Sequence, residues 1–438
     1  MIKRLLYVFC ISSVLHLPLT SGVVGQSMRD LVCDLFTLGC CHDACGLDLV
    51  DGENAAIFSF IQDGFVSMPG TLPAPAMSGD VIGYEDENGD LVPTSFGPIF
   101  AERAETLGSG RFFVGLQASS MSATSFNGAP TNRLFFNFAH EDSQQLSSVT
   151  NPTLADRPIK TRDILQVQTA LNTDIVVATT VLSAGLTNFL DIGVAIPVVR
   201  TRIQGHSYGQ ILALDPSAQH RLGGTSSNPV MSASSSVNGT ATGIGDISAR
   251  MKINLTGGVR RDQPPSTVGV AFLADVRLPT GDADELLGIE TGMIRALAIV
   301  SGRWDGISPH VNAGYLLRQG DGLPDAFLGT IGLDARASDH MTFALDLISQ
   351  WEYGSPKWSL PGAIRVPLDG SVPPIMLEPS SVPGLSSARD RRVLDMAAGL
   401  KFRIGSDMVL VTNALVPIRK VGLRPDMMWT LALQSAFR

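Results

Sequence analysis

The fold is decided by DISARMKINL, residues 246–255, because polar and apolar residues alternate strictly along it. One face of an extended chain would carry the polar residues Asp246, Ser248, Arg250, Lys252 and Asn254. The other face would carry the apolar residues Ile247, Ala249, Met251, Ile253 and Leu255. A period of two is typical of a strand, whereas a helix would mix the two sets. A run of about ten residues also matches the length of a tilted membrane-spanning strand.

The same alternation recurs along most of the chain after residue 110. Clear examples are 308–318, 341–352 and 393–404. Two runs, 291–302 and 408–418, alternate poorly, so the number of strands ranges from ten to fourteen around a best count of twelve. The twelve runs are 111–121, 163–184, 189–204, 244–256, 266–278, 291–302, 308–318, 325–336, 341–352, 392–404, 408–418 and 426–438.

The connections between these runs fall into two classes. Those after even-numbered runs are mostly short, such as Gly185–Asn188 and Ala337–His340, whereas 122–162, 205–243 and 353–391 are long. Short turns at one end and long loops at the other are typical of outer-membrane barrels. The sequence therefore predicts an all-β fold, a transmembrane antiparallel up-and-down β-barrel over 111–438. A soluble β-sandwich is the alternative.

Composition and the first residues limit the compartment and the partners. The chain has 438 residues, of which 17% are charged, and a net charge of −9, which excludes a generally basic nucleic-acid-binding protein. Residues 1–25 resemble a signal peptide, with Lys3 and Arg4, a mostly apolar run, and small residues before Gln26. A single membrane anchor is the alternative reading of this segment. Beyond it no stretch is long and apolar enough for a membrane-spanning helix. We therefore expect the protein to lie in the outer membrane of a Gram-negative bacterium.

Charged residues indicate which stripe of each strand faces the lumen. A Lys or Arg facing lipid near the bilayer midplane costs about 2–4 kcal/mol, so the polar stripes should point inward. The apolar stripe of the last strand, which includes Trp429 and Leu431, should meet lipid. The candidate lumen-lining residues are Asp246, Arg250, Lys252, Asp275, Arg277, Asp346, Asp395, Lys401 and Arg403.

Residues 26–110 precede the first barrel strand and form a separate segment. Four cysteines, Cys33, Cys40, Cys41 and Cys45, lie close together and are candidates for disulfides in an oxidising compartment, with their pairing left open. There are two alternatives to disulfides: a metal site that includes His42, or cysteines that remain free thiols. We expect no metal. We predict a short helix over Ile99–Leu107. Its charged residues Glu102, Arg103 and Glu105 are candidates for a plug inside the barrel.

One local motif raises the alternative of an enzyme. Residues 205–209, GHSYG, match the nucleophile pattern G-x-S-x-G with Ser207 at its centre. That motif requires a strand before the serine and a helix after it. No helix is predicted after residue 209, so we expect a glycine-rich loop there and no catalytic residues.

Five segments, in order, resemble the family named for the meta-pathway of phenol degradation. The resemblance spans 96–438 and lacks the first hundred residues. It implies an outer-membrane barrel loosely akin to channels for hydrophobic compounds. The insertion at 353–391 and the final Arg438 depart from the pattern. The segments are Phe96–Pro98 with Glu102–Gly108, Gly243–Ile247, Arg277–Asp282, His310–Tyr315 and Gly422–Asp426.

These observations together predict a channel or transporter for passive uptake of small compounds, hydrophobic or aromatic ones included. An outer-membrane enzyme or a closed structural barrel without transport is the alternative. The expected partners are outer-membrane lipid, a small permeant and the barrel-insertion machinery, with no nucleic acid and no cofactor.

Overall fold

The computed structural model describes residues 26–38, 57, 60, 61, 64, 84–85, 91–92, 96–140, 163–213, 222–225, 227–256, 267–304, 306–319, 324–353, 364–366, 375–384, 391–405 and 408–437. The predicted signal peptide, 1–25, lies outside these residues. Three of the four cysteines that were expected to form disulfides, Cys40, Cys41 and Cys45, lie outside them as well.

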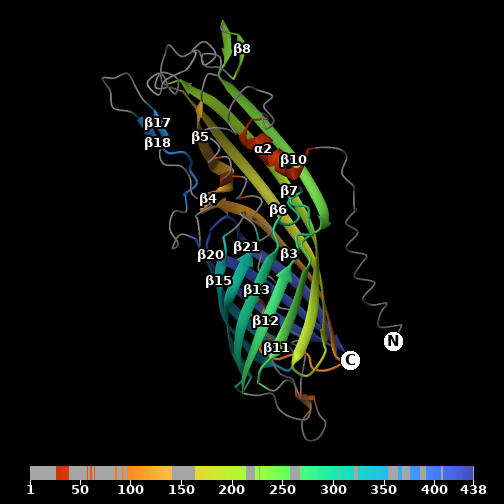
Figure 1. The fold of residues 1–438 in the computed structure, drawn as a ribbon. Helices are drawn as coiled ribbons and strands as arrows, with labels where there is room; N and C mark the ends of the chain where they lie inside the picture. Colours follow the sequence, from red (N-terminus) through yellow and green to blue (C-terminus); the bar gives the residue numbers. More distant parts are fainter. Residues whose placement is uncertain are drawn as a thin grey trace.

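Twelve of the described strands form a closed antiparallel ring (Figure 1). The last strand pairs with the first, which closes the ring. The predicted all-β barrel of twelve strands is therefore confirmed, and two separate sheets of a sandwich are excluded. The strands in ring order are β3 (Phe112–Phe126), β6 (Asp163–Gly185), β7 (Leu190–Ala213), β11 (Ser248–Asn254), β12 (Val268–Arg277), β13 (Met293–Gly302), β14 (Ile307–Arg318), β15 (Ala326–Ser338), β16 (Met341–Glu352), β19 (Arg392–Ile404), β20 (Met408–Arg419) and β21 (Leu423–Phe437).

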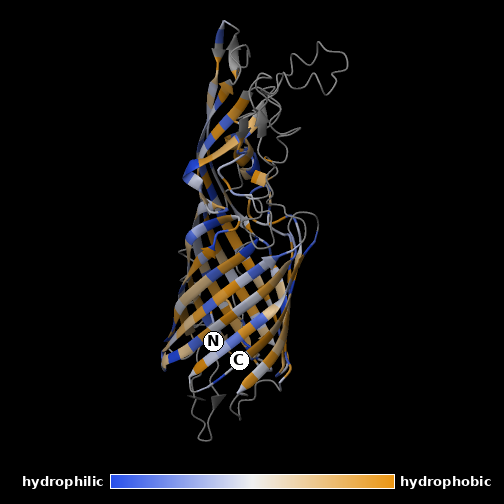
Figure 2. Cartoon of the chain, turned by 90° about the vertical axis from the view of Figure 1, so that its left-hand side faces the viewer, coloured by the Kyte–Doolittle hydropathy of each residue, from blue (hydrophilic) through white to orange (hydrophobic). Residues whose placement is uncertain are grey.

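The outer surface of the ring is apolar where the strands alternate. Exposed large apolar side chains include Phe272, Phe343, Leu345, Trp429 and Leu431. Hydrophobic and hydrophilic positions alternate along the barrel strands in Figure 2. Such a surface is suited to contact with lipid. Among the described residues, no helix combines the length and the apolar character that crossing a membrane requires.

Two ring strands continue beyond the barrel and form a sheet with two further strands. The upper part of β7 pairs with β10 (Ser232–Ile244), and the start of β6 pairs with β5 (Leu134–His140). We call this four-stranded sheet of β5, β6, β7 and β10 the extension (Figure 1). The expectation that 205–243 and 122–162 are loops is therefore wrong where β7, β10 and β5 occupy these segments. In particular, GHSYG lies inside β7 and not in a loop.

Local composition explains why β5 and β10 escaped detection. β5 is buried at Leu134, Phe136, Asn137 and Phe138, so it has no alternation of burial. β10 reads SASSSVNGTATGI, with small polar residues on its outer face and only Val237 and Ala241 buried. The break at 245–247 separates β10 from β11, so the predicted strand 244–256 starts later than expected.

A short helix, α2 (Met28–Phe36), packs against the extension. Ser27 caps it, and Ser27 and Asp30 form a capping box that satisfies backbone groups at the helix start. Its buried residues join an apolar cluster that continues into the barrel, and the Phe36 and Phe136 rings lie 5.3 Å apart. Arg29 pairs with Asp284 and Glu290 in the β12–β13 loop, each at 2.9 Å.

The remaining described elements are small. The residues described in the run 55–66, at positions 57, 60, 61 and 64, are helical and buried. The other short elements are β1 (Tyr84–Glu85), β2 (Leu91–Val92), β4 (Ala129–Pro130), the 3-10 turn η4 (Thr131–Arg133), β8 (Gly223–Thr225), β9 (Asn228–Val230), β17 (Ile364–Val366) and β18 (Ile375–Leu377).

Candidate functional site

Residues 96–108 cross the inside of the barrel before the first ring strand begins. We call this segment the strap. It is irregular throughout, so the helix expected over Ile99–Leu107 is not formed. Ala101 and Ala104 have no exposed surface, and Glu102 and Arg103 are also buried. The strap contacts the walls at β7, β11, β13, β14, β15, β16 and β19 through the contacts described below.

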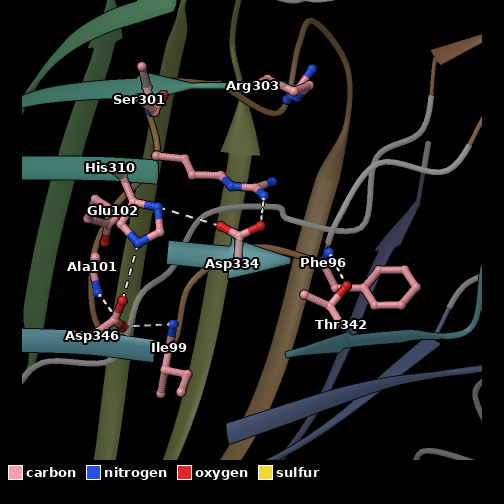
Figure 3. A network of polar contacts seen from close by, with 12 residues as sticks. Phe96, Ile99, Ala101, Glu102, Ser301, Arg303, His310, Asp334, Thr342 and Asp346 are labelled. Carbon is pink, nitrogen blue, oxygen red and sulfur yellow. Dashed lines mark hydrogen bonds and ion pairs between the residues drawn. The ribbon is translucent and has the colours of Figure 1, made fainter. Parts of the chain in front are cut away.

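Asp346 on β16 is the main backbone anchor of the strap. Its Oδ2 accepts hydrogen bonds from the backbone N–H groups of Ile99, Phe100 and Ala101, at 3.0, 2.7 and 3.1 Å. Figure 3 shows this carboxylate beside Ile99 and Ala101. Three consecutive N–H groups that converge on one buried carboxylate form a charge-assisted cradle.

Side chains of other strands satisfy the next stretch of strap backbone. Asn312 on β14 accepts from the Glu102 N–H at 2.7 Å and donates to the Glu102 carbonyl at 2.9 Å. Ser301 accepts from the Ala104 N–H at 3.1 Å, and Asn254 donates to the Ala104 carbonyl at 2.9 Å. These bonds replace the intrahelical bonds that the local sequence favours, which explains why no helix forms.

Two lysines and one carboxylate complete the backbone contacts of the strap, and the carboxylate of Asp191 on β7 accepts from the Leu107 N–H at 2.8 Å. Lys401 Nζ donates to the Phe96 carbonyl at 2.8 Å, and Lys252 Nζ donates to the Arg103 carbonyl at 3.3 Å. The Phe96 N–H donates to Thr342 at 3.0 Å, and the Arg403 guanidinium lies 5.1 Å from the centre of the Phe96 ring. The strap is therefore bound by polar side chains along most of its length.

The three charged residues of the strap each meet an opposite charge on the wall. Glu102 pairs with Arg250 at 2.5 Å and lies 3.9 Å from Lys252 Nζ. Arg103 pairs with Asp334 on β15. Glu105 pairs with Arg303 at 2.6 Å. Removing one partner of a buried ion pair leaves an uncompensated charge and typically costs about 3–5 kcal/mol.

His310 lies between two carboxylates next to the strap. Its Nδ1 is 3.5 Å from Asp334, its Nε2 is 3.2 Å from Asp346, and all three side chains are fully buried. A Cβ at Gly332 would lie 2.1 Å from His310 Nε2, so only glycine fits there. Figure 3 shows the imidazole between the two carboxylates that hold the strap.

The candidate lumen-lining residues fall into two groups by their contacts. Arg250, Lys252, Asp346, Lys401 and Arg403 contact the strap directly, as described above. Asp275 is buried beside Arg250, at 3.7 Å, and beside Arg295, at 3.4 Å.

Like Asp275, the other three candidates have no hydrogen bond or ion pair with the strap among the described residues. Asp395 is buried and pairs with Arg424, and Arg277 is half-buried at the end of β12. Asp246 lies between β10 and β11 and accepts from the N–H groups of Gly281 and Ile289, each at 3.0 Å. Burial raises the pKa of the Asp246 carboxyl above its ordinary value, although these N–H donors oppose the shift.

Sequence reasoning missed several strap contacts. Asp334, His310, Asn312, Asn254 and Ser301 were not selected, although each occupies an inward position of a strand by its burial. The polar stripe in 308–318 already placed His310 and Asn312 on one face. What the sequence could not show is that a segment two hundred residues earlier supplies their partners.

The other chemical motifs do not assemble into a site. Ser207 is fully buried within β7, and no turn or helix follows it in the strand, so the geometry of a nucleophile motif is absent. His206 hydrogen bonds to Ser236 on β10 at 2.9 Å. The described part of the chain contains no group of three or more side chains suited to a metal ion. Cys33 lies buried in α2, and its disulfide stays a prediction.

Solved structures with some similarity are outer-membrane proteins. An outer membrane channel from Pseudomonas putida F1 is 10% identical, with a TM-score of 0.42, over 76% of this chain and 98% of that one. A FadL homologue from Pseudomonas aeruginosa is 11% identical, with a TM-score of 0.30, over 75% and 89%. The toluene transporter TbuX of Ralstonia pickettii is 13% identical, with a TM-score of 0.27, over 84% and 100%. These scores are too low to add to the fold that the strand register establishes.

Comparison of the sequence with curated proteins found no match. Comparison with family models found one. Residues 161–363 match the model described as "Putative MetA-pathway of phenol degradation", which confirms, over that segment, the resemblance drawn from the sequence motifs.

Proposed function

We propose that this protein is an outer-membrane channel for passive uptake of small hydrophobic or aromatic compounds, and that the strap closes its lumen. The observation that carries the proposal is a closed barrel whose interior is crossed by a chain segment bound through wall side chains. Buried cationic side chains such as Arg250 and Lys252 and exposed apolar ones such as Met251 alternate on one strand. This arrangement is favourable only if lipid surrounds the barrel.

The orientation follows from the two ends of the barrel. Short connections, such as 186–189 and 339–340, lie at one end, and the extension lies at the other (Figure 1). Bacterial outer-membrane barrels have short periplasmic turns and long outer loops. We therefore place the extension outside the cell. The strap then lies toward the periplasmic end, because its partners Lys401, Thr342 and Asp191 stand near the short connections.

The strap is proposed to act as a gate. Its contacts are many but individually modest, because net contributions of hydrogen bonds are about 0.5–1.5 kcal/mol and of bonds to charged groups about 1.5–3 kcal/mol. Displacing the strap as a unit would expose the polar side chains that it now covers. An aqueous path lined by Arg250, Lys252, Asp346 and Lys401 would result.

The class of permeant is inferred from two sources. The matching family is described by a pathway of phenol degradation, so an aromatic permeant is favoured. On the outer side of the strap, the apolar cluster includes Phe60, Phe126 and Phe136, and the Phe60 and Phe126 rings stack at 5.2 Å. Aromatic side chains of this kind suit an aromatic or aliphatic solute.

An outer-membrane enzyme is the second candidate, and the buried position of Ser207 within a strand argues against it. Replacing Ser207 by Ala should leave phospholipid content and any lipid-hydrolysing activity of the purified protein unchanged. A loss of such activity would favour the enzyme.

Whole-cell uptake tests the channel proposal. A strain that lacks the protein should accumulate a labelled aromatic compound at a low concentration more slowly than the same strain complemented with the intact chain. Complementation with an Asp346→Asn variant should increase the rate further. Equal uptake with and without the protein, at matched expression in the outer membrane, would contradict a transport role.

Three further features belong to this proposal. Residues 1–25 would direct secretion and be removed, and the barrel-insertion machinery would assemble the chain. Cys33 would form a disulfide with one of the neighbouring cysteines. A mass measurement of the mature protein, with and without reduction, tests the cleavage and the disulfide.

A further inference from the structure

The outward face of β7 changes its chemistry twice along its length. In the barrel part the outward residues are apolar: Ile192, Val194, Ile196 and Val198. Arg200 and Arg202 follow on the same face, and both are exposed. Farther along the strand, in the extension, the outward residues are Gln204, His206, Tyr208 and Gln210.

The two arginines lie at the boundary between the apolar belt and the extension. Arg200 stands between Val176 on β6 and Thr242 on β10, and Arg202 between Asp174 and Thr240. Within the described part of the chain neither guanidinium has an ion pair, and Asp174 accepts hydrogen bonds from Ser122 and Asn172. Alternate residues of a strand are about 7 Å apart, so the two cations form one compact positive site.

Above the arginines the neighbouring strands present amides and hydroxyls. Gln204 lies between Asn172 and Asn238 in the strand register, and Tyr208 lies between Gln168 and Ser234. Planar amides, hydroxyls and an aromatic ring are the groups that hydrogen bond to and stack on sugars. The face therefore contains, in order, apolar, cationic and sugar-compatible chemistry.

We propose that this face of β6, β7 and β10 binds lipopolysaccharide of the outer leaflet, with Arg200 and Arg202 on a phosphate of its lipid moiety. The apolar belt contacts the acyl chains. The guanidinium groups form charge-assisted hydrogen bonds with the phosphate, as arginines do with phosphates elsewhere. The amide and hydroxyl ladders of the extension contact the sugars. Thr240 and Thr242 supply hydroxyl donors beside the cations.

This inference needs the outer-membrane location but does not depend on the permeant. It also gives the extension a role, because a sheet that stands in the sugar layer is stabilised where it contacts sugars. Along β7 the outward groups change from apolar to cationic to amide and hydroxyl, and across the outer leaflet the layers change from acyl chains to phosphates to sugars. The two orders match only if the extension lies outside the cell, as proposed above.

The test compares lipid retained by purified protein. The double variant Arg200→Gln with Arg202→Gln is compared with wild type and with Arg336→Gln, which removes an exposed cation at the short-turn end of the barrel. Each protein is extracted in mild detergent, checked for a boiling-dependent gel shift, and titrated with diphosphorylated lipid A and with enzymatically dephosphorylated lipid A.

We expect wild type and Arg336→Gln to bind the diphosphorylated lipid equally. The double variant should bind the diphosphorylated lipid at least about tenfold more weakly, because it loses one or more charge-assisted hydrogen bonds to the phosphate. Dephosphorylated lipid should bind all three proteins equally weakly. Equal binding of the phosphorylated lipid by the double variant, an equal loss in Arg336→Gln, or no preference for phosphate would overturn the proposal. A boiling-dependent gel shift in every variant would show that each barrel is folded. Failure of the lipid-binding proposal would then leave the channel proposal untouched.

Discussion

Replacing Asp346 by Asn should open the barrel without unfolding it. The carboxylate accepts three backbone N–H groups of the strap, from Ile99, Phe100 and Ala101. Asn keeps the size and one acceptor oxygen but loses the charge. Taking about 1 kcal/mol for each weakened bond gives about 3 kcal/mol less stabilisation of the docked strap. At about 1.4 kcal/mol per factor of ten, the undocked population rises by about a hundredfold.

Single-channel recording in planar bilayers measures this population as the fraction of time spent conducting. Asp339→Asn is the matched control, because Asp339 is an exposed carboxylate of a short turn that pairs only loosely with Arg336, at 3.7 Å. Asp346→Asn should conduct for a far larger fraction of time than wild type, and Asp339→Asn should behave like wild type. If folded Asp346→Asn conducts no more than Asp339→Asn, the strap is not the barrier.

Three further outcomes are expected. Glu102→Gln should lower the heat-modification midpoint on gels, because Arg250 loses its nearest carboxylate at a cost of about 3 kcal/mol, and adding Arg250→Gln should restore part of the loss. Gly239→Val should expose α2 to protease, since a Cβ there would lie 2.3 Å from an α2 leucine, whereas Gly329→Val, with open space around it, should not. The raised pKa of Asp246 means that its contribution to stability is fully present below about pH 3.8 and is lost as pH rises through the folded pKa. The heat-modification midpoint of wild type should therefore fall relative to that of Asp246→Asn as the pH rises from about 4 to about 7. A difference between the two midpoints that stays constant with pH would argue against a raised pKa at Asp246.

The barrel was predictable because its strands obey one rule. Each strand that separates lipid from lumen must alternate, as residues 246–255 do, and the energetic cost of a cation facing lipid fixes which stripe points inward. The extension was not predictable by this rule. β10 faces water on one side and α2 on the other, so its outward residues are polar and Gly239 replaces a large inward residue to admit the helix.

The strap shows the limit of local sequence reasoning more clearly. Glu102, Arg103 and Glu105 were identified as plug candidates from their position and charge, yet the helix expected there does not form. A helix is stabilised by its own backbone hydrogen bonds, whereas here Asp346, Asn312 and Lys252 take those groups instead. Contacts between residues two hundred positions apart leave no local signal in a single sequence.

The most direct test of the account is the conductance of a chain in which residues 97–107 are replaced by a flexible glycine-serine linker of equal length. The account predicts that the wild-type barrel is closed for nearly all of the recording and that the replaced barrel conducts steadily. Both proteins must show a boiling-dependent gel shift. A wild-type barrel that conducts as much as the replaced one, or a replaced barrel that stays closed, would contradict the claim that this is a channel closed by its own strap.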